Sequence, residues 1–340
     1  MLSQHSTLHT RLSALWKIVL PLLLGAAILY WMYRDTDFTA ILHALHYEMN
    51  WTWMLLSFPF GIMAQVFRAW RWQQTLSPVG EHPRTSITIH SIFISYASSL
   101  IIPRVGEFAR CAVLRRYDGV SFPRALGTVV TERAIDTLFV GVITGVTLLL
   151  QMSIFGTFFR HTGTSLDSLL RSFSPTGYVV VVICIAAILL LLHLLLRRLS
   201  FYRRVKTTVA AIWQGVTSLR SVNHPWRYVM LTIAIWGSYF LHYYLTFFCF
   251  PFTSSLDLSC ALVTFVVGTI AVIVPTPNGA GPWHFAVKTM LVLYGLTQAQ
   301  ALTFVLIVHT LQTLLVALLG VWAVMALLFT SVRTNNTQLS

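Results

Sequence analysis

Long apolar runs constrain the fold of this chain more than any other feature. A helix needs roughly 20 apolar residues to cross a hydrocarbon core of about 30 Å. Runs of this kind occupy Trp16–Tyr33, Trp51–Phe67, Ala125–Gln151, Tyr178–Leu196, Tyr228–Phe250 and Ala299–Leu328. With 56% hydrophobic and only 10% charged residues, the chain has too few polar side chains to cover a soluble surface. We therefore predict an all-α polytopic membrane protein.

Two further apolar runs are shorter and end in helix-breaking residues. Ile87–Ile102 is followed by a break from Pro103 to Gly106. Ser259–Val274 is followed by a Pro/Gly-rich break from Pro275 to Pro282. Proline and glycine at this density stop a helix. Each of these two segments is therefore predicted to form two short helices joined by a tip.

The basic residues indicate the orientation in the membrane. The net charge is +13, and most of the arginines and lysines fall in segments that one topology places on the same side. These are Arg11, Lys17, Arg68, Arg71, Arg84, Arg104, Arg110, Arg115, Arg116, Arg124, Arg197, Arg198, Arg203, Arg204, Lys206, Arg220, Arg227 and Arg333. Arg34, Arg160 and Arg171 fall on the other side. This positive-inside asymmetry predicts that both termini are cytoplasmic, with the first run as a retained signal anchor, and it explains the basic charge without nucleic acid.

The same rule favours a re-entrant topology. If Ile87–Ile102 crossed the membrane from the Arg68–Arg84 segment, the arginines after it would lie outside. Two re-entrant hairpins remove this conflict and give about six full spans in an inverted-topology repeat, a common transporter architecture. The halves are approximately 1–151 and 177–330 of a single transmembrane domain, 1–340, with no soluble catalytic domain. The alternative is eight or nine ordinary spans.

The two hairpin tips are the first candidate site. In the hairpin topology a helix begins near the midplane at each tip, where free backbone N–H groups and the helix dipole favour an anion such as phosphate. The alternative is a pair of structural kinks between ordinary helices. The predicted substrate-binding residues are Arg104, Gly106, Glu107, Arg110, Asn278, Gly279 and Gly281.

Charged residues inside the run Ala125–Gln151 form the second candidate site. Glu132 and Asp136 are four residues apart and share a helix face, and Arg133 is spaced to pair with Asp136. We expect Arg104 or Arg110 to compensate the remaining negative charge. This group is predicted to be a charge network or proton relay, and the alternative is an ion-pair cluster that only holds helices together.

Histidines and cysteines give no metal-binding pattern. His242 and His309 are expected to be hydrogen-bonded interior residues, whereas His284 adjoins the second tip and is a further candidate. The cysteines lack zinc spacing and are expected to pack as small apolar residues. They are Cys111, Cys184, Cys249 and Cys260. No metal, cofactor or nucleic acid is expected.

Four motifs together resemble one known family over nearly the whole chain. They are Arg68-Ala69-Trp70-Arg71-Trp72, Pro103-Arg104-x-Gly106-Glu107-x-x-Arg110, Glu132-Arg133-x-x-Asp136 and Pro275-x-Pro277-x-Gly279-x-Gly281. They resemble the lysylphosphatidylglycerol synthetase transmembrane, or flippase-like, domain family. The resemblance adds Arg68 and Arg71 as site candidates. It also implies a lipid-handling membrane domain that in some members translocates an aminoacylated phospholipid.

Two departures from the family limit what the resemblance implies. Members often carry an acidic residue shortly after the second glycine motif, where this chain has Trp283 and His284. The soluble aminoacyltransferase domain of the synthetase members is absent, so aminoacyl-lipid synthesis is not expected. We therefore expect a lipid translocator of a bacterial cytoplasmic membrane that handles an anionic phospholipid or a lipid-linked phosphate. The alternative is an enzyme, or an accessory of a separately encoded lipid-modifying enzyme, that acts on lipid-linked substrates.

Overall fold

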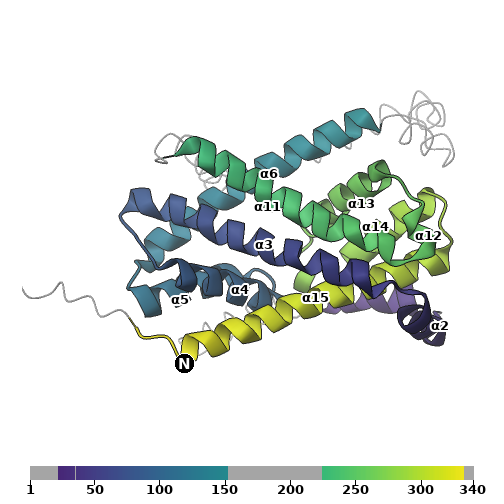
Figure 1. The fold of residues 1–340 in the computed structure, drawn as a ribbon, viewed down its shortest axis with the longest axis horizontal. Helices are drawn as coiled ribbons and strands as arrows, with labels where there is room; N and C mark the ends of the chain where they lie inside the picture. The colour runs from purple at the N-terminus through teal and green to yellow at the C-terminus, as the bar shows by residue number, and fades with distance from the viewer. Residues whose placement is uncertain (1–21, 35, 152–223, 333–340) are drawn as a thin grey trace, which may run out of the picture. The chain divides into compact units, whose positions relative to one another are not determined.

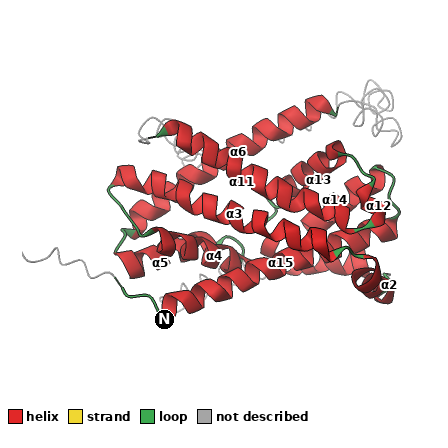
Figure 2. Cartoon of the chain, viewed as in Figure 1, coloured by secondary structure: helices red, strands yellow, loops and turns green. Residues whose placement is uncertain are grey.

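The structure, a computed structural model, describes residues 22–34, 36–151 and 224–332, and all regular secondary structure in these ranges is helical (Figures 1 and 2). This confirms the predicted all-α fold. Helix Leu22–Tyr33 is followed by α2 (Phe38–His43), η1 (Ala44–Glu48), α3 (Trp51–Leu76), η2 (Ser77–Val79), α4 (Thr85–Ile101), α5 (Val105–Asp118) and α6 (Phe122–Leu150). After the gap come α11 (Pro225–Tyr244), η4 (Leu245–Cys249), α12 (Pro251–Ser254), α13 (Leu258–Ala271), η5 (Pro277–Gly279), α14 (Pro282–Leu293) and α15 (Gln298–Leu328).

The chain forms two compact units. One comprises residues 1–132 with 220–340, and the other residues 133–219. Helix α6 begins in the first unit and continues into the second. The predicted span Tyr178–Leu196, Cys184 and the external arginines Arg160 and Arg171 lie outside the described residues, as does most of the basic loop after that span.

Both predicted helix breaks are present in the first unit. Helices α4 and α5 pack against each other, as do α13 and α14. Arg104 adopts a left-handed conformation with φ of 64° between α4 and α5. Gly106 then fits so closely that a Cβ there would clash with the carbonyl oxygen of Ser95. This glycine therefore permits tight packing of the two helices.

Arg84 links the start of α4 to the end of α5. Its backbone N–H and its Nε donate to the two carboxylate oxygens of the buried Asp118, at 2.8 and 2.6 Å. Its Nη2 also donates to the carbonyl oxygens of Tyr117 and Ser331 at 3.0 Å. Since Arg84 precedes α4 and Asp118 ends α5, the contact fixes the two ends of the pair.

The second tip is shaped by backbone that favours glycine. Gly279 and Gly281 have φ of 71° and 91°, and Asn278 has φ of 51°. A Cβ at Gly281 would lie 3.0 Å from the carbonyl oxygen of Gly25, so the N-terminal helix packs closely on this tip. The tip also lies against α4 of the first pair.

Each helix pair has its own apolar core within the first unit. Around the second pair, aromatic rings of Tyr243, Phe247, Phe250 and Phe304 pack together. Around the first pair, the core is formed by side chains from α3, α4, α5 and α6. Among its members are Trp72, Leu76, Ile87, Leu114 and Val129.

The structure corrects one sequence interpretation. Arg68 and Arg71 were expected in a cytoplasmic loop, but α3 continues without a break to Leu76, and both side chains are buried in it. The apolar run ends at Phe67 in the sequence because arginines occupy buried positions of the helix beyond it. These two residues therefore do not contribute to a basic loop.

Among the described helices, α15 is the one long and apolar enough to cross a membrane by length and composition. Leu22–Tyr33, α4 and α13 are shorter apolar helices. The full spans and the re-entrant insertion of the two helix pairs stay predictions.

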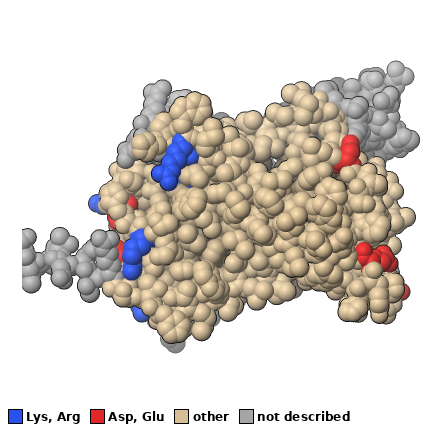
Figure 3. Space-filling model, viewed as in Figure 1, with Lys and Arg blue, Asp and Glu red and all other residues tan. Residues whose placement is uncertain are grey.

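On the face in Figure 3, basic side chains are visible near α5 and the start of α11, and acidic ones over α2 and the start of α13.

Candidate functional site

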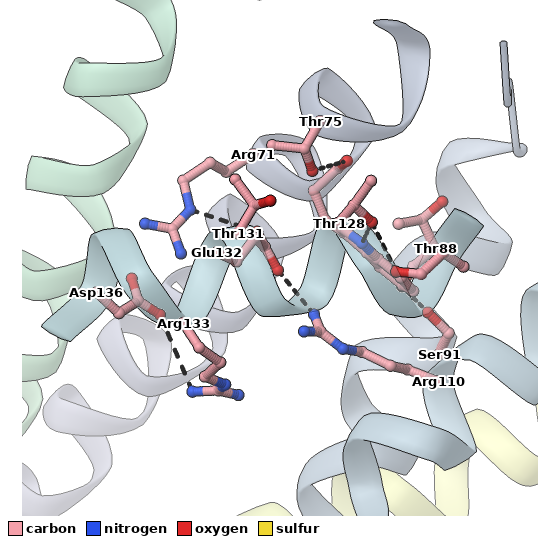
Figure 4. A network of polar contacts seen from close by, with 12 residues as sticks. Arg71, Thr75, Thr88, Ser91, Arg110, Thr128, Thr131, Glu132, Arg133 and Asp136 are labelled. Atoms are coloured by element: carbon pink, nitrogen blue, oxygen red, sulfur yellow. Dashed lines mark hydrogen bonds and ion pairs between the residues drawn. The ribbon is translucent and has the colours of Figure 1, made fainter. Parts of the chain in front are cut away.

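Three buried charged side chains meet in the first unit. Glu132, on the first half of α6, accepts a hydrogen bond at 2.9 Å through Oε2 from Nη1 of Arg110 on α5. Its other oxygen, Oε1, lies 3.5 Å from Nε of Arg71 on α3 (Figure 4). All three side chains are at most 1% exposed. We call Arg71, Arg110 and Glu132 the charge triad.

Aromatic rings cover both guanidinium groups of the charge triad. The Arg110 guanidinium carbon lies 4.4 Å from the centroid of the Trp72 ring. That of Arg71 lies 5.4 Å from the Tyr228 ring. A cation over an aromatic face gains about 2 kcal/mol when it is desolvated. These stacking contacts replace part of the hydration that the two arginines lose.

Hydroxyl groups fix the orientation of the triad and its aromatic neighbours. Arg71 Nη1 donates to Thr232 Oγ1 of α11 at 3.1 Å. Trp72 Nε1 donates to Thr128 Oγ1 of α6 at 2.9 Å. Through these contacts α3, α5, α6 and α11 are linked at one place. The triad is thus a junction of four helices.

Arg68 lies one helical turn before the triad on α3. It is buried, with its guanidinium carbon 6.0 Å from the Tyr96 ring and 5.9 Å from the Tyr239 ring. The two tyrosines are joined by a hydrogen bond of 2.8 Å from the Tyr239 hydroxyl to that of Tyr96. The buried guanidinium of Arg68 thus lies beside two tyrosine rings that a hydrogen bond holds together.

The sequence predicted part of this arrangement. Arg104 or Arg110 was expected to compensate the acidic residues of α6, and Arg110 pairs with Glu132. It was also predicted to bind substrate at the first tip, and its side chain points toward Glu132 in the junction (Figure 4). Arg104 is the exposed residue before α5, and Glu107 is half-buried in its first turn. Their predicted roles in substrate binding stay predictions.

Arg133 and Asp136 belong to the second compact unit. Arg133 Nη1 lies 3.9 Å from Asp136 Oδ2, so the two side chains pair as expected from their spacing of three residues. Arg133 is 44% exposed and Asp136 is buried. A partly exposed pair at this distance contributes at most about 1 kcal/mol. Their place in a charge network stays a prediction.

Asn278 at the second tip is tied to α15 by a closed ring of hydrogen bonds. Its Nδ2 donates to Thr313 Oγ1 at 2.6 Å, and Thr313 Oγ1 lies 3.4 Å from His309 Nδ1. His309 Nε2 lies 3.2 Å from the Asn278 carbonyl oxygen. Since the Thr313 oxygen accepts from the amide, its proton is available for Nδ1, and His309 then carries its own proton on Nε2.

The interior histidines behave as expected. His242 Nδ1 is 2.8 Å from the Ser57 carbonyl oxygen, and His309 is held in the ring just described. His284 is buried beside His309, with ring centroids 4.4 Å apart. The described cysteines, Cys111, Cys249 and Cys260, are free and buried. Over residues 22–34, 36–151 and 224–332, no group of three His, Cys, Asp or Glu side chains is placed to hold a metal ion.

Comparison with protein families matches residues 18–320 of the chain to the family described as Lysylphosphatidylglycerol synthase TM region. The chain belongs to this family. The match confirms the resemblance inferred from the four motifs, and it identifies the chain as a membrane protein related to lipid modification or translocation. Searches of curated proteins and of solved structures gave no match.

The family match covers all members of the charge triad. Sequence reasoning singled out Arg110 and Glu132 and gave Arg71 only as a further candidate. It included Trp72 only as part of a family motif, without a role in the site, and it missed Tyr228 and Thr232 altogether. The signal that could have found Trp72 is helical spacing, because Arg68, Arg71, Trp72 and Thr75 continue one face of α3.

Proposed function

We propose that this protein of the lysylphosphatidylglycerol synthase TM region family moves a lipid across the membrane and handles a phosphate-bearing headgroup. The charge triad is the observation that supports this proposal most. Two arginines held against one carboxylate, inside the helices of a membrane protein, are expensive unless they serve a site. Guanidinium forks also match the geometry of phosphate oxygens.

In the proposed mechanism, Glu132 holds the arginines until a headgroup arrives. The carboxylate contacts Arg71 and Arg110 through separate oxygens, as two oxygens of a phosphate would. Two arginines and one carboxylate carry a net charge of +1, so an incoming phosphate can take the place of Glu132 at one guanidinium while Glu132 keeps the other, and no charge is left unpaired in the membrane. This exchange is the step that couples headgroup binding to a rearrangement of the four helices.

Further residues complete the proposal. Arg104, Gly106 and Glu107 at the first tip, with Asn278, Gly279 and Gly281 at the second, are proposed to contact the headgroup during transfer. Arg133 and Asp136 are proposed to belong to the same charge network. The proposed location is a bacterial cytoplasmic membrane with both termini in the cytoplasm, and membrane lipids are the proposed partners.

Transport in reconstituted vesicles tests the proposal. The full chain is incorporated into vesicles that carry a fluorescent phosphatidylglycerol or a polyprenyl phosphate, and the appearance of lipid in the other leaflet is followed. Glu132→Gln and Arg110→Ala are expected to abolish the protein-dependent rate. Arg115→Ala removes an exposed arginine from the same helix and is expected to retain it. Rates equal to those of empty vesicles for both lipids would refute the proposal.

The family description, which refers to a synthase, favours one second candidate. In this alternative the chain is an enzyme acting on lipid-linked substrates, or an accessory of a separately encoded lipid-modifying enzyme. Product formation by the purified protein, abolished by Glu132→Gln, would support an enzyme. Product formation only after a partner enzyme is added would support an accessory.

A further inference from the structure

A cavity of about 700 Å³ opens in the first unit at the second tip. Its walls come from the N-terminal helix and the residues after it, the end of α4, the tip itself, α14 and α15. The volume lies within the range of about 300–1,000 Å³ typical of small-molecule sites. The charge triad contributes no residue to its lining. The cavity is therefore a separate place where a ligand fits.

Two buried polar groups on the cavity wall are without hydrogen-bond partners among the described residues. They are the hydroxyl of Tyr33 and Nδ1 of His284, on side chains that pack edge to face with ring centroids 6.2 Å apart. Tyr33 is 7% and His284 3% exposed. A buried polar group without a partner costs about 1–3 kcal/mol, so a ligand that bonds to both recovers this energy.

The neighbouring polar residues are already committed to each other. Asn278, Thr313 and His309 also line the cavity, but they form the closed ring that fixes the tip to α15. Tyr33 and His284, by contrast, have bonding capacity left for a ligand. Both can donate a proton to an oxygen atom.

The charge of the lining favours an anion. Arg34 lines the cavity, and none of the described lining residues is acidic. A guanidinium with two hydroxyl or imidazole donors suits phosphate oxygens.

The rest of the lining is apolar and extends to the surface. Leu29, Leu100 and Leu306 line the cavity, and so do Tyr30 and Phe38, which are 72% and 53% exposed. A free phosphate ion would gain nothing from this surface, whereas a lipid chain buries it. The wall therefore fits an amphiphile whose headgroup reaches Tyr33, Arg34 and His284.

We propose that this cavity binds the phosphate of a membrane lipid with a net negative headgroup and discriminates against lipids whose headgroup carries a net positive charge. The inference rests on the proposed function only in taking a lipid as the ligand. It makes the substrate an unmodified acidic phospholipid or a lipid-linked phosphate, and excludes a lysylated one. Binding is measurable without transport, so the two proposals fail separately.

The experiment measures lipid binding to the full chain in detergent micelles. The probes are phosphatidylglycerol, a polyprenyl phosphate, lysylphosphatidylglycerol and inorganic phosphate. Either anionic lipid is expected to bind about tenfold more tightly than the lysylated lipid, because the lysylated lipid keeps its phosphate but brings ammonium groups that Arg34 repels. Arg34→Glu is expected to remove this preference, whereas Arg115→Glu, the same charge change at an exposed position on α5, is expected to leave it intact.

Conservative variants keep the test informative if Arg34→Glu does not fold. Tyr33→Phe and His284→Phe preserve the rings and are each expected to weaken the anionic lipid about tenfold, since each removes one hydrogen bond to a charged group. Equal binding of anionic and lysylated lipids would overturn the inference, and so would unchanged affinity in both phenylalanine variants. Competition by inorganic phosphate alone at the affinity of the lipid would also overturn it. Intact lipid discrimination without transport would refute only the proposed function.

Discussion

Arg110 on α5 and Glu132 on α6 are joined by a hydrogen bond of 2.9 Å with both side chains buried. The two residues are 22 positions apart, and the link ties the first helix pair to the helix that follows it. Both residues belong to the charge triad. The interaction energy between them is therefore the most direct measure of how strongly the triad holds its helices together.

A double-mutant cycle on Arg110 and Glu132 is expected to reveal strong coupling. Arg110→Met and Glu132→Leu should each lower the free energy of unfolding by about 3–5 kcal/mol, because each removes one member of a buried ion pair. The double variant should lose less than the sum, with a coupling energy of about 0.5–3 kcal/mol. Thermal or denaturant unfolding in micelles measures all four proteins.

An exposed ion pair provides the control for this cycle. Arg124 Nη1 and Glu81 Oε1 lie 3.3 Å apart, and Arg124 is 60% exposed. The same cycle on this pair is expected to give a coupling energy below about 1 kcal/mol. A coupling energy between Arg110 and Glu132 no larger than that of the exposed pair would contradict the view that the triad holds the four helices together.

Gly106→Ala is expected to disrupt the first helix pair. The new methyl group would meet the Ser95 carbonyl oxygen of α4, and backbone cannot move aside as a flexible side chain does. We expect a loss of at least about 1–3 kcal/mol in the free energy of unfolding, the usual cost of overpacking. Gly127→Ala on α6 is the matched control, because a methyl group there meets nothing within 4 Å.

The control has an expected sign of its own. Replacing a helical glycine by alanine in open space should stabilise the protein by about 0.5–1 kcal/mol. A stable Gly106→Ala protein with unchanged transport would show that the helix pair tolerates a wider separation. The two variants together therefore distinguish tight packing from a general effect of glycine.

Asp257 is expected to make the start of α13 sensitive to acid. Hydrogen bonds from the Ser259 hydroxyl and the Cys260 backbone N–H hold the pKa of this carboxyl below its usual value. The folded pKa is lower than the unfolded one, so the cap is fully effective above about pH 4 and is lost as the pH falls through the folded pKa.

Substitutions at Asp257 separate the cap from its charge. Asp257→Ala should cost about 1 kcal/mol at neutral pH, whereas Asp257→Asn should retain most of the stability, because asparagine caps a helix as well. The contribution of Asp257 to the acid dependence of the free energy of unfolding should be absent from both variants. Unfolding midpoints measured between pH 3 and pH 7 check this, and an unchanged acid dependence in Asp257→Asn would assign it to other groups.

The helix breaks could be predicted from the sequence because their causes are local. Proline and glycine act within one or two residues, so Pro103 to Gly106 and Pro275 to Pro282 mark the tips without knowledge of the rest of the fold. The pairing of Arg110 with α6 could also be predicted. An acidic residue in an apolar helix requires a cation, and the nearby basic motif offers Arg104 and Arg110 as candidates.

The end of α3 and the composition of the site could not be predicted in the same way. An arginine after an apolar run normally marks the membrane surface, but Arg71 is stabilised by Glu132, Thr232 and Tyr228, which lie far along the chain. Hydropathy along the sequence contains no information on such distant partners. The cavity at the second tip was missed for the same reason, since its walls come from four separate stretches of the sequence.

The membrane insertion of the two helix pairs stays a prediction that single-cysteine labelling can check. Phe108 adjoins Glu107 and is 52% exposed, and Ile273 precedes the second tip and is 66% exposed. With the native cysteines replaced, Phe108→Cys and Ile273→Cys are expected to react with a membrane-impermeant maleimide from opposite faces. The reason is that an inverted repeat opens its two hairpins to opposite sides.

Two features of the chain sharpen this labelling experiment. Of the four native cysteines, all of which are replaced by alanine, Cys111, Cys249 and Cys260 are buried small residues whose replacement should cost little stability. Arg116→Cys, exposed near the end of α5, serves as a reference for the face from which the first pair enters. It should react from the same face as Phe108→Cys. If Phe108→Cys and Ile273→Cys instead react from one face, the two pairs are ordinary spans or share one orientation, and the inverted repeat is wrong.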